Sequence, residues 1–363
     1  MFKYYYIINN NYIIMVSEYN EFRGKGLSGL ANLGNTCYLN SCLQTLSHTY
    51  ELHHLIHTLD FDYIKQNSKN IDSLNILIEW KKLSDLMWSK NCTIAPHGFV
   101  KAIHAYSVKT NNTLFCNFSQ NDLQEFLMFL FDAFHLGISK SNDIYEKSIS
   151  HNHLDIDKDK YFKMMNDNFK NEYSEIIDLF YGTCYSEITS IETRKFLSKR
   201  FQPFFILNLS LPEKNNISLH DCFEHHLKYE ELKDENAWLD EKTQSKVNVN
   251  KRDVLWKLPH IFIIHLKRWN YNGNKNQSIV QFDLNCDFSK YVCNNNNHNN
   301  NYELYSISNH HGNSSGGHYT AFVKNANNKW YLFNDTNVTE INEQSLITNQ
   351  AYCLFYRKKV KFS

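Results

Sequence analysis

Proline is scarce in this chain, and segments that would separate independent domains are missing. Among 363 residues there are 4 prolines, and no stretch rich in proline or in glycine and serine interrupts the sequence. A chain of this length can bury a large core, either in one large domain or in two lobes. The sequence therefore favours a single folded unit over a string of separate domains.

An excess of charge of either sign is also missing. The 38 basic and 38 acidic residues give a formal net charge of zero. Generic binding of nucleic acid needs a basic surface, so neutrality argues against it, although this sum does not exclude a local basic patch. We therefore predict no nucleic-acid partner.

The N-terminus lacks the features of a membrane span and of a signal peptide. It is aromatic and apolar, but Asn9–Asn11 interrupt it before the run is long enough to cross a bilayer. A basic start and a small-residue cleavage site are missing too. We predict no membrane contact and a non-catalytic extension over residues 1–25, either poorly ordered or adding a strand, with Met15 as an alternative start.

The sequence also lacks paired cysteines. The nine cysteines are scattered and odd in number, and no CxxC pair occurs. This pattern argues against a secreted disulfide scaffold and leaves a four-thiolate zinc site without obvious ligands. We predict a reducing, intracellular compartment, cytoplasmic or nuclear, and no metal or other cofactor.

A thiol is present at the start of a predicted helix. Leucines at positions 39, 43 and 46 share one face of a helix over 36–50. Asn35 and Thr36 suit its N-cap, so Cys37 lies in the first turn, where free N–H groups and the helix dipole favour a thiolate. The other interpretation is a buried structural cysteine, which we assign to Cys42, Cys116 and Cys353. Asn32 is either a donor to an oxyanion beside the Cys37 amide or an ordinary turn asparagine.

An imidazole follows a glycine pair near the other end of the chain. Gly316 and Gly317 allow close approach of another backbone or of a substrate. His318 is either the base that a thiol needs or one more strand histidine among 18 in the chain. Asn334 or Asp335, at the end of the next aromatic strand, would hold its second nitrogen across a hairpin. The residues alone leave both interpretations of His318 open.

The hydrophobic patterns change along the chain. A second helix is predicted over 120–135, and the charged stretch 141–175 suggests helices with exposed faces. Short runs rich in β-branched and aromatic residues predict strands over 204–211, 261–266, 303–309, 318–323, 329–333 and 351–356. Helices first and strands later indicate an α+β protein with a cleft between lobes.

The two reactive segments closely resemble the Cys box and the His box of the ubiquitin-specific proteases. The Cys box is GLANLGNTCYLNS at 29–41, and the His box is GGHYTAF at 316–322 followed by WYLFND at 330–335. Other blocks resemble the family in the same order: QNDLQEFL at 120–127, IDLFYG at 177–182, LPHIFIIHLKRW at 258–269, YELYSISNH at 302–310 and AYCLFY at 351–356. The resemblance covers about residues 26–357.

The resemblance implies a papain-like cysteine peptidase that hydrolyses isopeptide and peptide bonds at the C-terminal glycine of ubiquitin. Its catalytic domain would cover 26–363, with a helical thumb over about 26–180 and a β-sheet palm with reduced fingers over about 181–363. Cys37 would be the nucleophile, His318 the base and Asn334 the third member, with Asp335 in support and Asn32 at the oxyanion. Ubiquitin and ubiquitinated proteins would be the partners.

The resemblance also implies a set of substrate contacts. Asp122 and Glu125 would meet arginines near the ubiquitin tail, although both also suit a helix N-terminus. We include Gln120 of the same motif and the glycine pair, and His310 would lie in a loop that borders the cleft.

One family feature is missing. Ser190 and Thr193 stand where relatives carry the first CxxC pair, and residues 229–250 hold no cysteine for a second. We therefore expect the fingers to be short or free of metal. Two alternative functions stay open: an inactive ubiquitin-binding module and a peptidase for another ubiquitin-like modifier.

Overall fold

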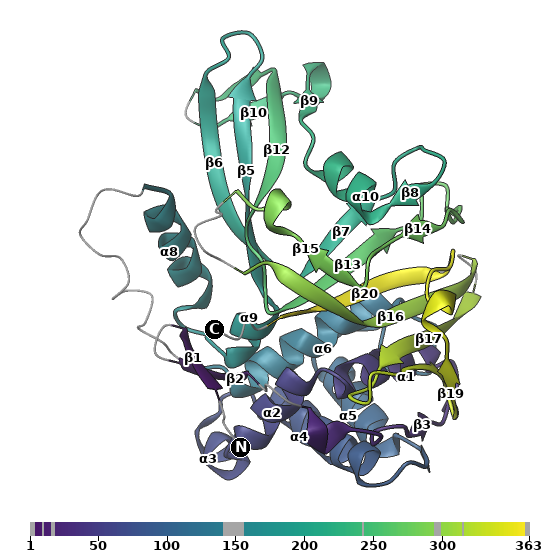
Figure 1. Cartoon of the computed structure of the whole chain (residues 1–363). Coiled ribbons are helices and arrows are strands. Elements are labelled where there is room, and N and C mark those ends of the chain that lie inside the picture. The colour runs from purple at the N-terminus through teal and green to yellow at the C-terminus, as the bar shows by residue number, and fades with distance from the viewer. Residues whose placement is uncertain are drawn as a thin grey trace.

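Most helices lie in the first half of the chain and most strands in the second. The computed structural model describes residues 4–8, 11–15, 19–140, 156–241, 243–293, 299–313 and 316–359. Figure 1 shows the purple and blue helices packed below a large green and yellow sheet, from which a second sheet projects upward. We call the helices of residues 37–180 the thumb, the large sheet the palm and the projecting sheet the fingers.

The thumb contains both predicted helices. Its helices are α1 (Cys37–Ser47), α2 (Tyr50–Thr58), α3 (Phe61–Asn67), α4 (Ile71–Ser89), α5 (His97–Lys109), α6 (Leu123–Ile138), α8 (Ile156–Phe169) and α9 (Glu175–Phe180). The helices predicted over 36–50 and 120–135 are confirmed as α1 and α6. The latter begins at Leu123 because Asp122 is its N-cap. In the charged stretch 141–175, α8 forms as expected, and 141–155 lie outside the described residues.

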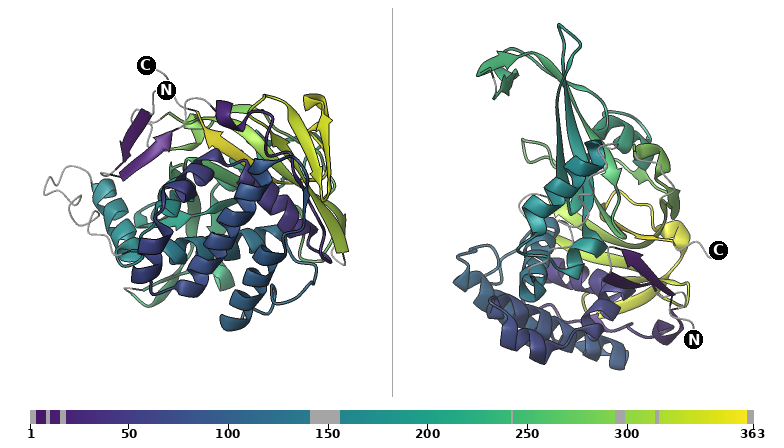
Figure 2. Two further views of the ribbon diagram at one scale, coloured as in Figure 1. Left: turned by 90° about the horizontal axis from the view of Figure 1, so that it is seen from below. Right: turned by 90° about the vertical axis from the view of Figure 1, so that its left-hand side faces the viewer.

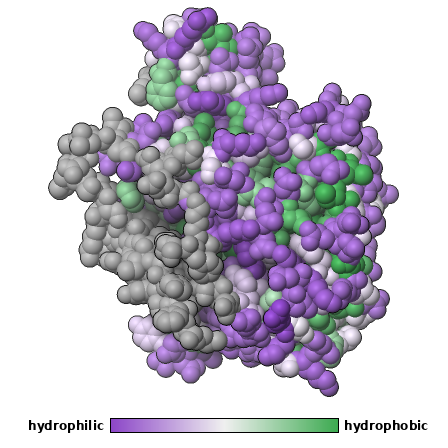
Figure 3. All heavy atoms as spheres, in the orientation of Figure 1, coloured by the Kyte–Doolittle hydropathy of each residue, from purple (hydrophilic) through white to green (hydrophobic). Residues whose placement is uncertain are grey.

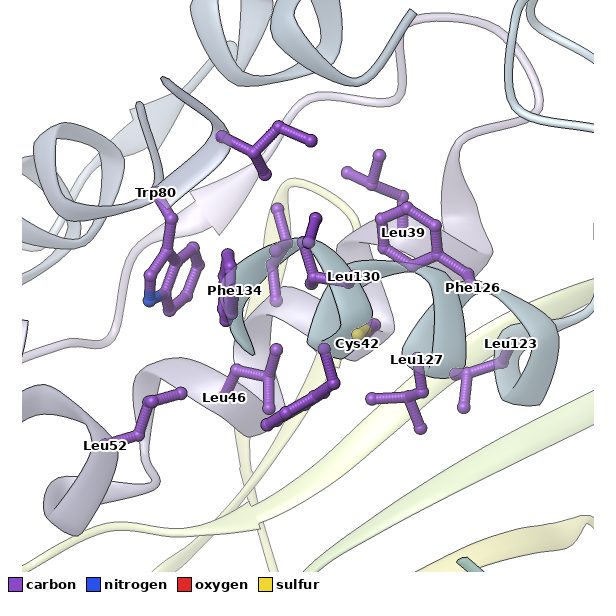
Figure 4. Close-up of a cluster of buried hydrophobic side chains, with 14 of the residues drawn as sticks. Leu39, Cys42, Leu46, Leu52, Trp80, Leu123, Phe126, Leu127, Leu130 and Phe134 are labelled. Carbon is purple, nitrogen blue, oxygen red and sulfur yellow. The ribbon is translucent and has the colours of Figure 1, made fainter. Parts of the chain in front are cut away.

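The core of the thumb forms because apolar residues of α6 recur with a helical period. Six of them are at most 1% exposed: Leu123, Phe126, Leu127, Leu130, Phe131 and Phe134. Figure 4 shows most of this stripe beside Leu39, Cys42 and Leu46 of α1 and Trp80 of α4. Complete burial of such a side chain contributes about 1.5–3 kcal/mol, so this core fixes α1, and with it Cys37, in place.

The palm is an eight-stranded sheet with the order β19-β18-β17-β16-β20-β13-β7, and β15 pairs with β16. Its strands are β7 (Ile206–Ser210), β13 (Ile261–Lys267), β15 (Asn285–Asp287), β16 (Asn301–Asn313), β17 (Gly316–Lys324), β18 (Trp330–Asn334), β19 (Asn337–Ile341) and β20 (Ala351–Lys358). All six predicted strands are present. Among the described strands of the palm, only β7 and β13 pair in parallel. Strand β16 extends beyond its prediction because its pairing with β17 continues to Asn313 and Gly316.

The fingers are a four-stranded sheet with the order β6-β5-β12-β9. Its strands are β5 (Gly182–Ser190), β6 (Phe196–Phe204), β9 (Glu230–Leu232) and β12 (Val249–Lys257), and a hairpin of β10 (Trp238–Asp240) and β11 (Ser245–Val247) lies nearby in sequence. Figure 2 shows this sheet extending away from the thumb. Three of its strands have nine residues.

Aromatic packing supports the base of the fingers. The rings of Phe201 and Trp256 meet edge to face, with centroids 5.2 Å apart. Tyr185 packs beside both of them. Within the described residues, no group of three or more His, Cys, Asp or Glu side chains is placed to hold a metal. The absence of metal from the protein stays a prediction.

The predicted N-terminal extension contains two strands. β1 (Tyr4–Ile8) and β2 (Asn11–Met15) pair with each other as a separate hairpin. Closer to the thumb, Phe22 is buried and stacks on Tyr50 with ring centroids 4.5 Å apart. Packing against the thumb therefore starts before residue 26, where we expected the catalytic domain to begin.

The remaining elements are short. They are β3 (Gly29–Leu30), β4 (Thr93–Ile94), β8 (Ile217–Ser218), β14 (Val280–Gln281), α10 (Leu219–His226) and 3-10 turns at Asn20–Phe22, Asp234–Asn236, Ser289–Tyr291 and Glu343–Ser345. The face drawn in Figure 3 is largely hydrophilic, with hydrophobic residues gathered in separate patches. Among the described residues, no helix is both long and apolar enough to cross a membrane.

Candidate active site

Cys37 is the first residue of α1 and is 4% exposed. Thr36 occupies the predicted N-cap, but its side chain makes no capping hydrogen bond. Asn35, the other candidate, has a left-handed φ of 51°. Helix α1 therefore begins where the sequence predicts, without a side-chain cap.

The pKa of Cys37 shifts in the direction opposite to our prediction. Burial raises the pKa of its thiol, and the negative charge of Asp335 adds to the rise, whereas backbone N–H groups, chiefly that of Tyr319, oppose it. Our prediction of a favoured thiolate was wrong, because the loss of water outweighs the hydrogen bonds of the helix start. A buried thiol of this kind needs a base before it can attack.

His318 and Asn334 form a hydrogen-bonded pair across the β17–β18 hairpin. The His318 Nε2 and Asn334 Oδ1 atoms are 2.7 Å apart. Because an amide oxygen only accepts, Nε2 carries the proton. In the neutral ring the lone pair then lies on Nδ1, which leaves that nitrogen available to take a proton.

Asp335 belongs to a different hydrogen-bond network. Its Oδ2 accepts from Asn32 Nδ2 at 3.0 Å, and its Oδ1 accepts from Asn40 Nδ2 at 2.8 Å. Its backbone oxygen accepts from the N–H of Leu30 at 2.8 Å. The carboxylate therefore holds the loop before Cys37, whereas the neighbouring amide meets the imidazole.

Asn32 is held at both ends of its amide. Its Oδ1 accepts from the backbone N–H groups of Gly34 and Thr36, both at 3.1 Å, and from the Thr36 hydroxyl at 3.2 Å. One Nδ2 hydrogen is donated to Asp335. A primary amide has two such hydrogens, so one remains that can donate to a substrate oxyanion.

A cavity of about 390 Å³ opens beside Cys37. Six predicted site residues line this cavity: Cys37, Gln120, Asp122, His310, Gly316 and Gly317. Six further residues complete its wall: Asn35, Tyr38, Asn121, Trp269, Asn313 and Tyr319. Sequence reasoning assigned none of these six a place in the substrate site.

The glycine pair lies close to the wall of the cavity, and close packing requires glycine at position 317. A Cβ atom on Gly317 would lie 2.2 Å from His310 Nε2 and 2.4 Å from the His311 oxygen. On Gly316 it would lie 2.9 Å from Gln120 Oε1, which also accepts from the Gly317 N–H at 3.3 Å. A side chain at Gly317 would push the wall of the cavity apart because it meets backbone, whereas one at Gly316 meets only the flexible end of Gln120.

Asp122 has a clear structural task. Its Oδ1 accepts from the N–H groups of Gln124 and Glu125 at 2.8 and 3.2 Å, which caps α6. Its Oδ2 accepts from the hydroxyls of Tyr319 and Tyr352 at 3.1 and 2.5 Å. The helix-terminus interpretation is therefore right, and contact with a substrate arginine stays a prediction.

Glu125 lies outside the residues that line the cavity and is exposed. Partial burial raises the pKa of its carboxyl, and the charge of Asp122 adds to the rise. No hydrogen bond or ion pair engages this carboxylate within the described chain. Its side chain is therefore available to a cation from a partner.

His310 lies in strand β16, not in a loop as we expected. It pairs with Tyr319 of β17 and is buried. Lys275 Nζ lies 3.0 Å from its Nδ1. Burial, followed by the charge of Lys275, lowers the pKa of His310 to about 4, so the ring is neutral near pH 7. The hairpin extends past His310 because the glycines at its end tolerate close pairing, a signal that was present in the sequence.

Two residues that support the site from behind the cavity wall were also missed. Asn40 joins Asp335 to α1, and Lys275 holds His310. Asn40 lies about one helical turn after Cys37, so helical spacing places the two residues on the same side of α1. No sequence signal places Lys275 beside His310.

A thiol at a helix start, an imidazole on the facing sheet with an amide behind it, and a cavity between thumb and palm define a papain-like arrangement. The sequence matches the family model described as "Ubiquitin carboxyl-terminal hydrolase" over residues 28–356. The chain belongs to the ubiquitin carboxyl-terminal hydrolase family.

Several relatives support this assignment. Ubiquitin carboxyl-terminal hydrolase 2 of Homo sapiens is 32% identical over 348 residues, which cover 93% of this chain and 56% of that protein. Usp2 of Drosophila melanogaster is 31% identical, and the match covers 94% of this chain and 36% of that protein. Ubiquitin carboxyl-terminal hydrolase 2 of Gallus gallus is 33% identical, and the match covers 92% of this chain and 93% of that protein. The chain thus spans from about a third to over half the length of the first two relatives.

A solved structure shares the fold. Ubp8 in the SAGA DUB module bound to monoubiquitin matches with a TM-score of 0.69 and 24% identity, over 95% of this chain and 72% of that chain. The likeness confirms the α+β, papain-like fold predicted from the sequence.

Proposed function

We propose that this chain is a thiol hydrolase that cleaves isopeptide and peptide bonds at the C-terminal glycine of ubiquitin. The observation that carries the proposal is the pairing of His318 with Asn334, because the chain neighbours of His318, Gly317 and Tyr319, line the same cavity as Cys37. Membership of the ubiquitin carboxyl-terminal hydrolase family supports the substrate, as does the similar fold of Ubp8, whose structure holds monoubiquitin.

The first half of the reaction forms a thioester. His318 Nδ1 takes the proton from the Cys37 thiol, and sulfur attacks the carbonyl carbon of the terminal glycine. The free Nδ2 hydrogen of Asn32 and the Cys37 amide stabilise the oxyanion. The C–N bond then breaks, and His318 gives its proton to the leaving lysine amine.

The second half releases ubiquitin. His318 takes a proton from water, the resulting hydroxide attacks the thioester carbon, and the carbon–sulfur bond breaks. Cys37 leaves as a thiolate and regains the proton from His318. Asn334 keeps the imidazole in one tautomer throughout, since its oxygen accepts from Nε2.

The cavity suits a tail that ends in glycine. Gly316, Gly317 and His310 restrict its width, and a peptide without side chains next to the scissile bond fits such a channel. Asp122 and the exposed Glu125 provide negative charge for arginines near the tail. Ubiquitinated proteins are therefore the proposed substrates, and an intracellular location stays a prediction.

An adduct experiment tests the proposal against its two alternatives. The protein is incubated with ubiquitin that carries a C-terminal electrophile, and a covalent adduct is expected with the wild type and with Cys42→Ala but not with Cys37→Ala. Cys42 is a matched control because it is a buried thiol of the same helix. Retained binding without an adduct would indicate an inactive binding module. An adduct only with another ubiquitin-like modifier would move the substrate to that modifier.

A further inference from the structure

Asn40 lies on α1, is 2% exposed and directs its Nδ2 at three acceptors. These are Asp335 Oδ1 at 2.8 Å and the backbone oxygens of Leu30 and Ala31 at 3.3 and 3.4 Å. Its own Oδ1 is buried without a hydrogen-bond partner. An unpaired buried acceptor costs about 1–3 kcal/mol, so this orientation of the amide is kept in spite of a penalty.

The three acceptors lead directly to Asn32. Leu30 and Ala31 are the two residues before it, and Asp335 accepts from its Nδ2 at 3.0 Å. Asp335 is itself fixed by a left-handed φ of 49° and by the Leu30 N–H bond to its backbone oxygen. Asn40 thus holds Asn32 through the loop backbone and through the carboxylate.

We propose that Asn40 is a positioning residue for the oxyanion donor of this enzyme. The inference rests on the proposed hydrolase function and adds a residue to it. Asn40 acts through Asp335 on Asn32 and does not touch the substrate. Without it, the Asp335 carboxylate loses one of its two amide donors, and the free Nδ2 hydrogen of Asn32 is no longer held toward the developing oxyanion.

This role makes a prediction that a purely structural role does not. The network of Asn40, Asp335 and Asn32 shares no hydrogen bond with the pair of His318 and Asn334. Alkylation of Cys37 by iodoacetamide passes through no oxyanion, whereas hydrolysis of ubiquitin does. Loss of Asn40 should therefore slow hydrolysis and leave alkylation unchanged.

The first test compares Asn40→Ala with Gln44→Ala. Gln44 is a matched control because it is a buried amide of the same helix that donates to the Ser28 backbone oxygen at 2.7 Å. With a fluorogenic ubiquitin amide, we expect kcat of Asn40→Ala to fall about 10- to 100-fold, within the range for a misplaced catalytic group, with KM nearly unchanged. Gln44→Ala should keep its kcat. Equal slowing of hydrolysis and iodoacetamide alkylation in Asn40→Ala would overturn the inference.

The second test exchanges the two side chains, in case Asn40→Ala folds poorly. Asn40→Asp alone sets two carboxylates against each other and should lose most activity. Adding Asp335→Asn restores a donor between the two side chains: the new amide gives Nδ2–H to position 40, and its oxygen still accepts from Asn32. Recovery should be partial, because a carboxylate at position 40 does not donate to the Leu30 and Ala31 oxygens. We expect the double variant to recover at least about tenfold over Asn40→Asp, the size of a coupling between touching groups. A double variant no faster than Asn40→Asp would refute the inference.

The wild type separates the failure of this inference from the failure of the proposed function. A wild type inactive on ubiquitin would refute the proposed function. An active wild type with an unaffected Asn40→Ala would refute this inference alone.

Discussion

Replacing Asn334 with alanine is the sharpest test of which residue orients His318. The substitution removes the acceptor that lies 2.7 Å from Nε2, so the ring is free to rotate and to place its proton on Nδ1. A positioned base contributes about 10²- to 10⁴-fold to rate. Because a neutral amide holds the ring with less energy than a carboxylate would, we expect the low end, a fall in kcat of about 10²-fold or about 2.7 kcal/mol.

The assay measures kcat with a fluorogenic ubiquitin amide and the rate of Cys37 alkylation on the same preparations. Asn334→Ala should slow both, because His318 serves as base in both. Asp335→Ala should slow hydrolysis but not alkylation, since its carboxylate holds Asn32 and Asn40. If turnover falls only when Asp335 is replaced, then Asn334 does not orient the imidazole and our assignment is wrong.

Four further outcomes follow from the structure. Gly317→Ala should lower kcat/KM about tenfold in the same assay, because its Cβ would lie 2.2 Å from His310 Nε2 and overpacking costs about 1–3 kcal/mol; unchanged kinetics would contradict the tight wall. Asp335→Asn should lower the pKa of Cys37, read from the pH dependence of alkylation, since the carboxylate contributes to its rise; a pKa equal to or above that of the wild type would contradict this. Burial lowers the pKa of His48 to about 4, so at this position the unfolded chain binds a proton below about pH 6.5 that the folded chain does not bind. His48 alone should therefore lower the free energy of unfolding by about 2 kcal/mol between pH 7 and 5. His48→Gln should remove that part of the slope in chemical denaturation. Elemental analysis should find no stoichiometric zinc, and one zinc per chain would refute that.

The sequence predicted the elements and singled out Cys37 and His318 as candidate reacting groups because both inferences depend on local pattern. The helical stripe of α6 and the alternating aromatic strands are local signals, and they led to the right elements. Cys37 and His318 were found because each lies in an unusual local setting, a polar loop before a helix and a glycine pair before a strand. The His310 prediction failed because we did not extend the β16–β17 hairpin to the glycines at its end, although its strands pair as far as Asn313 and Gly316.

Long-range burial explains the other failure. A helix start favours a thiolate, but whether Cys37 is a thiolate depends on water, and 4% exposure removes most of that water. The sign of the pKa shift therefore came from packing between thumb and palm, which no single segment encodes. With its pKa raised, the Cys37 thiol depends on the base that we propose, His318, for its activation.

Asn334 and Asp335 contact different partners because the backbone turns between them. Asn334 is the last residue of β18, so its side chain follows the alternation of the strand and meets His318 on β17. Asp335 turns into a left-handed conformation with φ of 49°, and this turn sends its carboxylate toward α1 and the loop before Cys37. Two adjacent polar residues thus contact different partners: Asn334 contacts the His318 imidazole, and Asp335 accepts from the amides of Asn32 and Asn40. The position of Asp335 beside Asn334 is therefore no evidence that Asp335 orients His318. Its carboxylate instead accepts hydrogen bonds from Asn32 and Asn40.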